Sequence, residues 1–164
     1  MGLFDFLKRK NSDKQNEKTD SSNQESLDDF TRDMIKSADF FVNSKSDRFK
    51  GLDFSVDSLV IVENVLDEAA DFYNDMSEEQ RQNLVSTVGS YIFEVARRNF
   101  GGKYYWYDHL NQPIFVTGQP DFETSILAFD KVKGRLENGA EDNIPFYFAG
   151  YVEGVKNKKS GMIV

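Results

Sequence analysis

The sequence predicts an α+β fold in which about five helices pack on a small antiparallel sheet centred on a hairpin at residues 103–117. Three observations support this prediction. Apolar residues recur at helical spacing over most of the chain, a double glycine at 101–102 ends one of these segments, and a run of aromatic residues follows it. Because a hairpin with rings on both faces is not stable alone, we expect helices to cover at least one face.

Composition divides the chain of 164 residues into three parts. Residues 1–10 form a short apolar and basic segment, and residues 11–25 contain no apolar side chain. A segment of that composition cannot offset its ordering entropy by burial, so residues 11–25 are predicted to be a disordered linker. Residues 26–160 are predicted to form a single α+β domain, with a flexible end at 161–164.

Two helices are predicted before residue 76. The first begins at Ser26, because Ser26-Leu27-Asp28-Asp29 resembles a capping box, and it continues to about Asn43. The second follows Ser55, which can cap it. Their apolar stripes consist of Leu27, Phe30, Met34, Ala38, Phe41 and Val42 in the first helix, and Leu59, Val62, Leu66, Ala69 and Tyr73 in the second.

The third helix and the hairpin have the clearest boundaries. Ser77 and Gln80 form a capping box at the start of the helix, and Gly101 supplies a left-handed residue at its end. Residues 103–107 and 112–117 then form the strands, with a turn at 108–111. Because strand side chains alternate, Tyr104 and Trp106 are expected on one face, and Tyr105 and Tyr107 on the other.

Three shorter elements complete the prediction. A short strand is expected around Phe122, and a fourth helix runs from about residue 126 to a stop at Gly139. Residues 144–157 allow two interpretations. Pro145 suits the first turn of a helix, whereas the alternation of Ile144, Phe146 and Phe148 also permits a strand; the helix is the favoured interpretation.

Charge and composition exclude several classes of function. The net charge of −8 disfavours a nucleic-acid partner, because such proteins usually carry a basic face. The absence of cysteine excludes thiolate metal sites, and the single histidine excludes a His-rich one, so no metal or cofactor is predicted. No apolar run approaches the ~20 residues of a membrane span, and no signal peptide is evident, so the predicted location is the cytoplasm.

Two segments carry a family resemblance. Residues 88–102 contain Gly-x-Tyr-x-x-Glu-Val and then Asn-x-Gly-Gly, and residues 129–142 contain Lys-Val-x-x-Arg-Leu-x-Asn-Gly. With the aromatic strands between them, they resemble a group of bacterial domains of unknown function, over about residues 52–155. Phe93 stands where that group often has glycine, and Trp106 lies three residues later than its pattern places it. The resemblance implies a bacterial cytosolic α+β domain with no established activity, and similar small acidic proteins occur as toxin-immunity partners.

Glu94 and Arg98 are the first candidate site. They lie four residues apart on the third predicted helix, in the favourable order for an ion pair. One interpretation makes Glu94 a general base tuned by Arg98, and the other makes them a structural pair that holds the helix against the hairpin. The structural interpretation is favoured, because no nucleophile, metal cluster or phosphate-binding loop accompanies the pair. No catalytic residue is therefore predicted, and His109 is interpreted as an exposed turn residue.

A protein-interaction surface is the second candidate. A two-stranded hairpin cannot bury every ring, and exposed tyrosine and tryptophan side chains are frequent contacts in protein interfaces. A surplus of carboxylates would favour a basic partner. The residues predicted to form this surface are Tyr105, Trp106, Tyr107, Glu141 and Asp142.

The N-terminal segment leaves a second possibility open. Its apolar and basic side chains suit weak contact with an anionic membrane surface. The favoured interpretation is a flexible terminus, which can also dock on the chain's own domain. Its contact residues are Leu3, Phe4, Phe6, Leu7, Lys8, Arg9 and Lys10.

The sequence therefore supports three hypotheses of function. The favoured one is a non-enzymatic protein-interaction domain, immunity-like or adaptor-like. The alternative is a peripheral membrane protein tethered by residues 1–10. An enzyme of unknown reaction is the least favoured.

Overall fold

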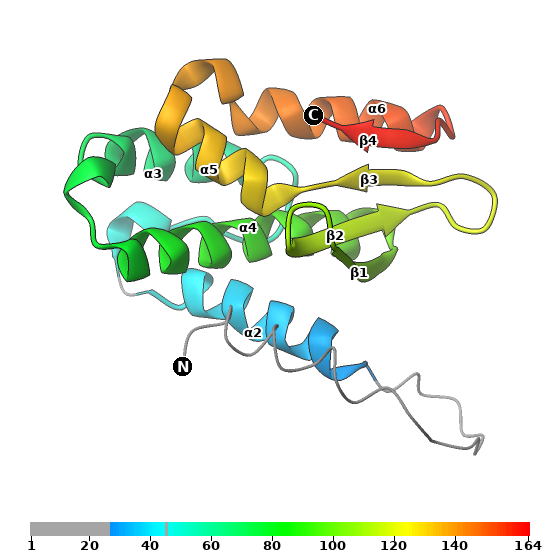
Figure 1. Ribbon diagram of the computed structural model, residues 1–164, viewed down its shortest axis with the longest axis horizontal. Coiled ribbons are helices and arrows are strands. Elements are labelled where there is room, and N and C mark those ends of the chain that lie inside the picture. Colours follow the sequence, from blue (N-terminus) through cyan, green and yellow to red (C-terminus); the bar gives the residue numbers. More distant parts are fainter. Residues whose placement is uncertain (1–26, 45) are drawn as a thin grey trace.

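The structure is a computed structural model that describes residues 27–44 and 46–164, and it confirms the predicted α+β fold class (Figure 1). The predicted segments 1–10 and 11–25 lie outside the described residues. The α-helices are α2 (Asp29–Val42), α3 (Leu59–Ala70), α4 (Glu78–Phe100), α5 (Ala128–Asn138) and α6 (Ile144–Lys156). The strands are β1 (Lys103–Tyr107), β2 (Gln112–Thr117), β3 (Thr124–Ile126) and β4 (Gly161–Ile163), and the 3-10 helices are η2 (Asp47–Phe49), η3 (Tyr73–Asp75) and η4 (Ala140–Asp142).

The predicted helix caps are confirmed where the motif is local. In the capping box of α4, the Ser77 amide donates to Gln80 Oε1 at 2.9 Å and the Gln80 amide donates to Ser77 Oγ at 3.2 Å. Gly101 ends α4 with a φ of +72°, and Gly139 ends α5 with a φ of +83°. Residues 144–156 form a helix, capped by the Asn143 side chain. Asn143 accepts the Phe146 amide proton at 3.0 Å, which favours the helix over the strand.

The two N-terminal helices begin later than predicted. Ser26 lies outside the described residues, and Asp28 caps α2 by accepting the Thr31 amide proton at 2.7 Å. Ser55 caps a turn that precedes α3, because the Ser58 amide donates to Ser55 Oγ and α3 begins at Leu59. Tyr73 lies in η3 rather than in α3, although it still reaches the core.

The sheet has the strand order β1-β2-β3-β4. β1 pairs with β2, and β2 with β3, in the predicted antiparallel sense. The pairing of β4 with β3 is parallel, so the sheet is mixed. The strand expected around Phe122 lies at residues 124–126 instead.

The prediction of a flexible end at 161–164 is wrong, because residues 161–163 form β4. The Gly161 amide donates to the Glu123 carbonyl at 2.9 Å, and Thr124 Oγ1 donates to the Lys159 carbonyl at 2.7 Å. These bonds hold the last residues of the chain along β3, beside α6 (Figure 1).

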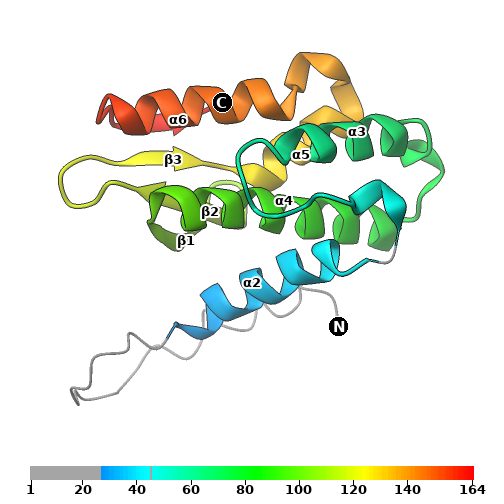
Figure 2. The ribbon, with the colours of Figure 1, turned by 180° about the vertical axis from the view of Figure 1, so that it is seen from behind.

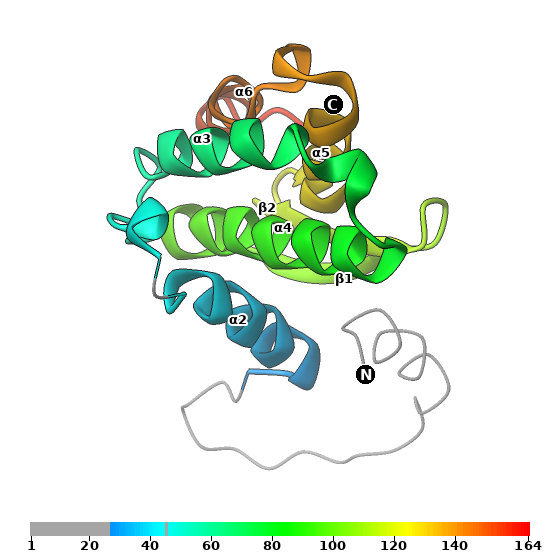
Figure 3. The ribbon, with the colours of Figure 1, turned by 90° about the vertical axis from the view of Figure 1, so that its left-hand side faces the viewer.

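Helix α4 is the centre of the molecule. It lies between α2 and α3 (Figure 3), and every residue from Val85 to Ala96 is buried except Thr87. Gly89 permits the closest approach of α5, because a Cβ at this position would lie 2.4 Å from Phe129 Cδ1. The core therefore surrounds one helix on several sides.

The two faces of the sheet have different neighbours. The inner face presents Tyr104, Phe115 and Ile126 to the main core cluster, which includes residues of α4 and α6. These helices lie behind the sheet in Figure 1 and in front of it in the opposite view of Figure 2. Within the described residues, no helix lies across the other, outer face; α5 touches only its end, where the Asp130 amide donates to Gln112 Oε1.

Candidate functional site

Glu94 is a fully buried carboxylate that receives hydrogen bonds from two arginines. Arg97 Nε donates to its Oε2 at 2.7 Å, and Arg97 Nη2 donates to its Oε1 at 2.9 Å. The predicted partner Arg98 also binds it, with 3.3 Å between Arg98 Nε and Glu94 Oε1. Sequence reasoning missed Arg97, although its spacing of three residues on a helix is a recognisable signal.

A tyrosine from the hairpin completes this network. The Tyr104 hydroxyl donates to Glu94 Oε2 at 2.9 Å, which joins β1 to α4. Burial, followed by the nearby Glu94 charge, raises the pKa of Tyr104 well above its ordinary value, so its proton stays in place. The hydrogen bonds that Arg97 donates to Glu94 raise the pKa of Arg97 as well.

The geometry of Glu94 supports the structural interpretation. Its two oxygens accept hydrogen bonds from Arg97, Arg98 and Tyr104, and its side chain is closed to solvent. The Arg98 guanidinium also lies over the Phe54 ring, 3.5 Å from its centroid. A general base needs a free lone pair aimed at a substrate, whereas these oxygens are occupied by the protein itself.

The three predicted aromatic contacts of the hairpin do not share one face. Tyr105 and Tyr107 lie on the outer face, as the strand alternation predicts, and Tyr105 is 42% exposed. Trp106 is half-buried and lies on the same side as Tyr104, opposite Pro113 of β2. The predicted surface therefore keeps its two tyrosines together and separates the tryptophan from them.

The outer face carries a small hydrophobic cluster of its own, here called the outer-face cluster. It consists of Tyr107, Ile114, Val116, Leu127 and Met162. These residues come from β1, β2 and β4 and from the position directly after β3, and no helix contributes a residue to the cluster. Ile114, Val116 and Leu127 are buried, with 8%, 9% and 6% of their surface exposed, so they form the floor of this face. The part that a binding partner can contact consists of half-buried Tyr107 and Met162 and of Tyr105.

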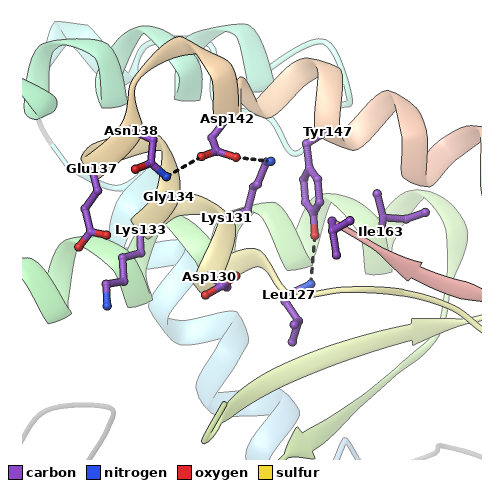
Figure 4. A pocket seen from close by; sticks show the side chains of 11 residues that line it. Leu127, Asp130, Lys131, Lys133, Gly134, Glu137, Asn138, Asp142, Tyr147 and Ile163 are labelled. Atoms are coloured by element: carbon purple, nitrogen blue, oxygen red, sulfur yellow. Dashed lines mark hydrogen bonds and ion pairs between the residues drawn. The ribbon is translucent and has the colours of Figure 1, made fainter. Parts of the chain in front are cut away.

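Asp142 lies in a groove at the end of the outer face, formed by α5, η4, α6 and β4 (Figure 4). The groove has a volume of about 380 Å³. Lys131 Nζ donates to Asp142 Oδ1 at 2.6 Å, and Asn138 Nδ2 donates to Oδ2 at 3.1 Å. These bonds, that of Lys131 first, lower the pKa of Asp142.

The groove continues the outer face through one shared residue. Leu127 belongs to the outer-face cluster and also lines the groove, as Figure 4 shows beside Tyr147 and Ile163. Leu127 is thus the residue that the groove and the outer-face cluster have in common. Glu141 is exposed in η4 and is not among the groove residues, so the structure divides the predicted acidic pair.

A second buried charge was missed by sequence reasoning. Arg135 is 2% exposed; its Nε donates to Glu63 Oε1 at 2.6 Å, and its Nη2 donates to Asp67 Oδ1 at 2.7 Å. Glu63 Oε2 also accepts the amide proton of Ile144, at the start of α6. The network ties α3, α5 and α6 together. Glu63 and Asp67 precede Arg135 by about 70 residues in the sequence, so no local spacing could reveal the pairing.

The remaining candidates add no reactive group. His109 is exposed in the hairpin turn, with its ring centroid 5.3 Å from that of Tyr107. Among the described residues, no group of three or more His, Cys, Asp or Glu side chains is placed to hold a metal ion. Over the same part of the chain, no helix has the length and hydropathy to cross a bilayer. The membrane contact predicted for residues 1–10 lies outside the described residues.

Comparison with known proteins gives no assignment. No family model, no curated protein and no solved structure matches this chain. The function must therefore be inferred from the surfaces themselves.

Proposed function

We propose that this protein is a non-enzymatic interaction domain that binds a protein partner through the outer face of its sheet. The supporting observation is the outer-face cluster, an apolar group that no described helix covers. Tyr105 lies on β1, at one edge of this face, with 42% of its surface exposed. Tyr107 on the same strand and Met162 on β4, at the opposite edge, are half-buried. Half-exposed rings over an apolar floor are typical of contacts that dominate binding energy.

The charges around this face favour a basic partner. Asp108 lies in the turn at one end of the sheet. Asp121 and Glu123 lie in the connection at the other end, where exposed Lys103, Lys158 and Lys159 also lie and balance them. Asp130 and Glu137 line the groove. Lys131 is paired with Asp142, so its charge is balanced within the groove. Lys133 also lines the groove, so the excess of carboxylates at the groove end comes from Asp108, Asp130 and Glu137. A basic partner would be attracted to that end, chiefly through a faster association rate.

The proposed location is the cytoplasm, and an immunity-like or adaptor-like role fits a small acidic binding domain. The buried state of Glu94 supports the choice of a binding domain over an enzyme, because that carboxylate is occupied by arginine and tyrosine partners. The family resemblance of residues 52–155 stays a prediction.

The test compares capture by the full chain with capture by two matched variants. Tyr105→Ser with Met162→Ser alters the outer face, and Phe72→Ser alters an exposed ring after α3. A partner of this face is bound by the wild type and by the Phe72 variant, and its affinity falls about 30-fold or more for the outer-face variant. The identified partner is then titrated in purified form.

The salt dependence provides the second readout. If the carboxylates steer a basic partner, the association rate falls as ionic strength rises, while the dissociation rate changes little. Equal affinity of all three chains for every captured protein would refute the proposed surface.

A further inference from the structure

We propose that residues 3–10 of this same chain dock on the outer face of the sheet and compete there with the partner. The surface is defined by the outer-face cluster and Tyr105, and the proposed occupant is the apolar and basic segment at the start of the chain. The docking can be tested alone, whereas the competition rests on the proposed function.

The segment and the face are chemically complementary. The segment places Leu3, Phe4, Phe6 and Leu7 directly before Lys8, Arg9 and Lys10. Its apolar side chains match the exposed parts of Tyr105, Tyr107 and Met162. Covering such rings removes apolar area from water, which favours docking and offsets the entropy lost when the segment is ordered.

Charge gives the docking its direction. The three consecutive cations follow the apolar residues, so they come to lie beside the apolar contact rather than on it. Asp108 and the groove carboxylates Asp130 and Glu137 lie at one end of the outer face, whereas Asp121 and Glu123 at the other end are balanced by nearby lysines. The cations of the segment are therefore expected at the groove end. The segment is therefore attracted to the same carboxylates that favour a basic partner.

The connecting chain is long enough for this contact. Sixteen residues, 11–26, separate the segment from Leu27, the first described residue. Such a length spans up to ~53 Å when fully extended, whereas a domain of about 140 residues has a radius of gyration of about 14 Å. The outer face is within reach of the segment from the start of α2.

Because the segment is tethered to the domain, a weak intrinsic affinity for the outer face is enough to keep it docked part of the time. A tethered segment has an effective concentration on the order of 1 mM at its site, so an intrinsic dissociation constant of about 1 mM leaves it docked half of the time. A partner that needs the free face then binds about twofold more weakly to the full chain than to a chain whose segment cannot dock.

The experiment uses a spin label at the start of the full chain. The chain has no cysteine, so Gly2→Cys provides one unique attachment site for a nitroxide. Methyl NMR signals of Ile114, Val116, Leu127 and Met162 report the outer face, and the signal of Val60, 56% exposed on α3, reports the far side. Docking broadens the outer-face signals and leaves that of Val60 sharp.

Matched variants test the apolar part of the contact. Phe4→Asp with Phe6→Asp in the labelled chain should remove the broadening, and Asn11→Asp with Asn16→Asp, which adds the same charge in the linker, should retain most of it. Equal broadening of Val60 and the outer-face signals, or broadening that survives the phenylalanine changes, refutes the docking.

Two further arms identify other occupants. A labelled chain mixed with an isotope-enriched unlabelled chain shows outer-face broadening only if a second copy is the occupant, and that result refutes docking within one chain. The second arm tests a membrane as the occupant. If the outer-face signals are not broadened in buffer, and the full chain but not the phenylalanine variant sediments with anionic vesicles, the segment binds a membrane, and docking within the chain is refuted.

Failure of this inference is separable from failure of the proposed function. The spin-label arms need no partner, so they decide the docking even if the outer face binds no other protein. If docking and partner binding are both observed, the phenylalanine variant should bind the partner about twofold more tightly than the wild type. Unchanged partner affinity would refute the competition.

Discussion

The two faces of the same short sheet have different structural roles. On β2, Phe115 points into the main core and is fully buried, while its neighbours Ile114 and Val116 point outward into the outer-face cluster. The inner face packs against helices, whereas the outer face, within the described residues, meets a helix only at its end, where α5 begins. The comparison indicates that the inner face stabilises the fold, and that the outer face can be changed with a smaller cost in stability.

The largest expected effect comes from removing an inner-face ring. Phe115→Ala should lower the free energy of unfolding by about 3–5 kcal/mol, because it leaves a cavity beside Phe93 and Tyr104. Tyr105→Ala on the outer face should lower it by about 1 kcal/mol or less. Urea unfolding of both variants measures the difference, and equal losses would contradict the contrast between the faces.

The buried Glu94 network gives the next largest effect. Glu94→Ala should cost about 3 kcal/mol, because Arg97, Arg98 and the Tyr104 hydroxyl lose their shared acceptor. The cost stays below that of a fully enclosed network, since both arginines are partly exposed and can be hydrated. Glu79→Ala, in the exposed first turn of α4, is the control, and a similar loss there would argue against a special role for Glu94.

Alkaline pH should lower the free energy of unfolding through the buried tyrosines on the inner side of the sheet. Tyr151 shares a 2.6 Å hydrogen bond with Thr117 of β2, and burial raises its pKa to about 12. An unfolded tyrosine loses its proton near pH 10, so the folded state binds more protons between pH 10 and 12. The contribution of each such tyrosine to the free energy of unfolding is fully present below pH 10. Above pH 10 the free energy of unfolding falls by up to about 1.4 kcal/mol per pH unit for each such group.

Tyr151→Phe separates this contribution from the others. Its free energy of unfolding should fall less steeply between pH 10 and 11 than that of the wild type, as measured by urea titration at each pH. Parallel slopes for the two proteins would show that Tyr151 does not carry the effect.

The smallest expected effect is a stabilisation. Gly150 lies inside α6, and a Cβ there would meet Ile163 Cγ2 of β4 at 3.6 Å, an ordinary contact. Gly150→Ala should therefore raise the free energy of unfolding by about 0.5–1 kcal/mol. Thermal unfolding measures it, and a lower melting temperature would mean that α6 and β4 are packed more tightly than the distance implies.

Local chemistry made part of this fold predictable. The capping box at Ser77 and the stops at Gly101 and Gly139 depend on neighbouring residues alone, and they were located from the sequence. The alternation of β1 placed Tyr105 and Tyr107 on one face. The pair of Glu94 and Arg98 was also predicted, because both residues lie within one helical turn.

Features that depend on distant partners were not predictable. β4 is three residues long, and its partner β3 precedes it by 37 residues. Three residues are too few to show the alternation of a strand, so the sequence does not indicate this pairing. Arg135 finds Glu63 and Asp67 only after α3 and α5 meet. The absence of a helix across the outer face, among the described residues, likewise follows from the assembled layers, and no local pattern in the sequence indicates it.

The enclosure of α4 has a consequence for unfolding cooperativity. Since the middle of this helix touches several elements and almost no solvent, its amide hydrogens can exchange only when the whole molecule opens. α2 packs chiefly on one side of α4, through Met34, Ala38 and Phe41, and we expect it to open at a lower free energy than α4, which is enclosed on several sides. Exchange rates would then rank the two helices, with α4 reporting global unfolding and α2 a partial opening that leaves the sheet intact.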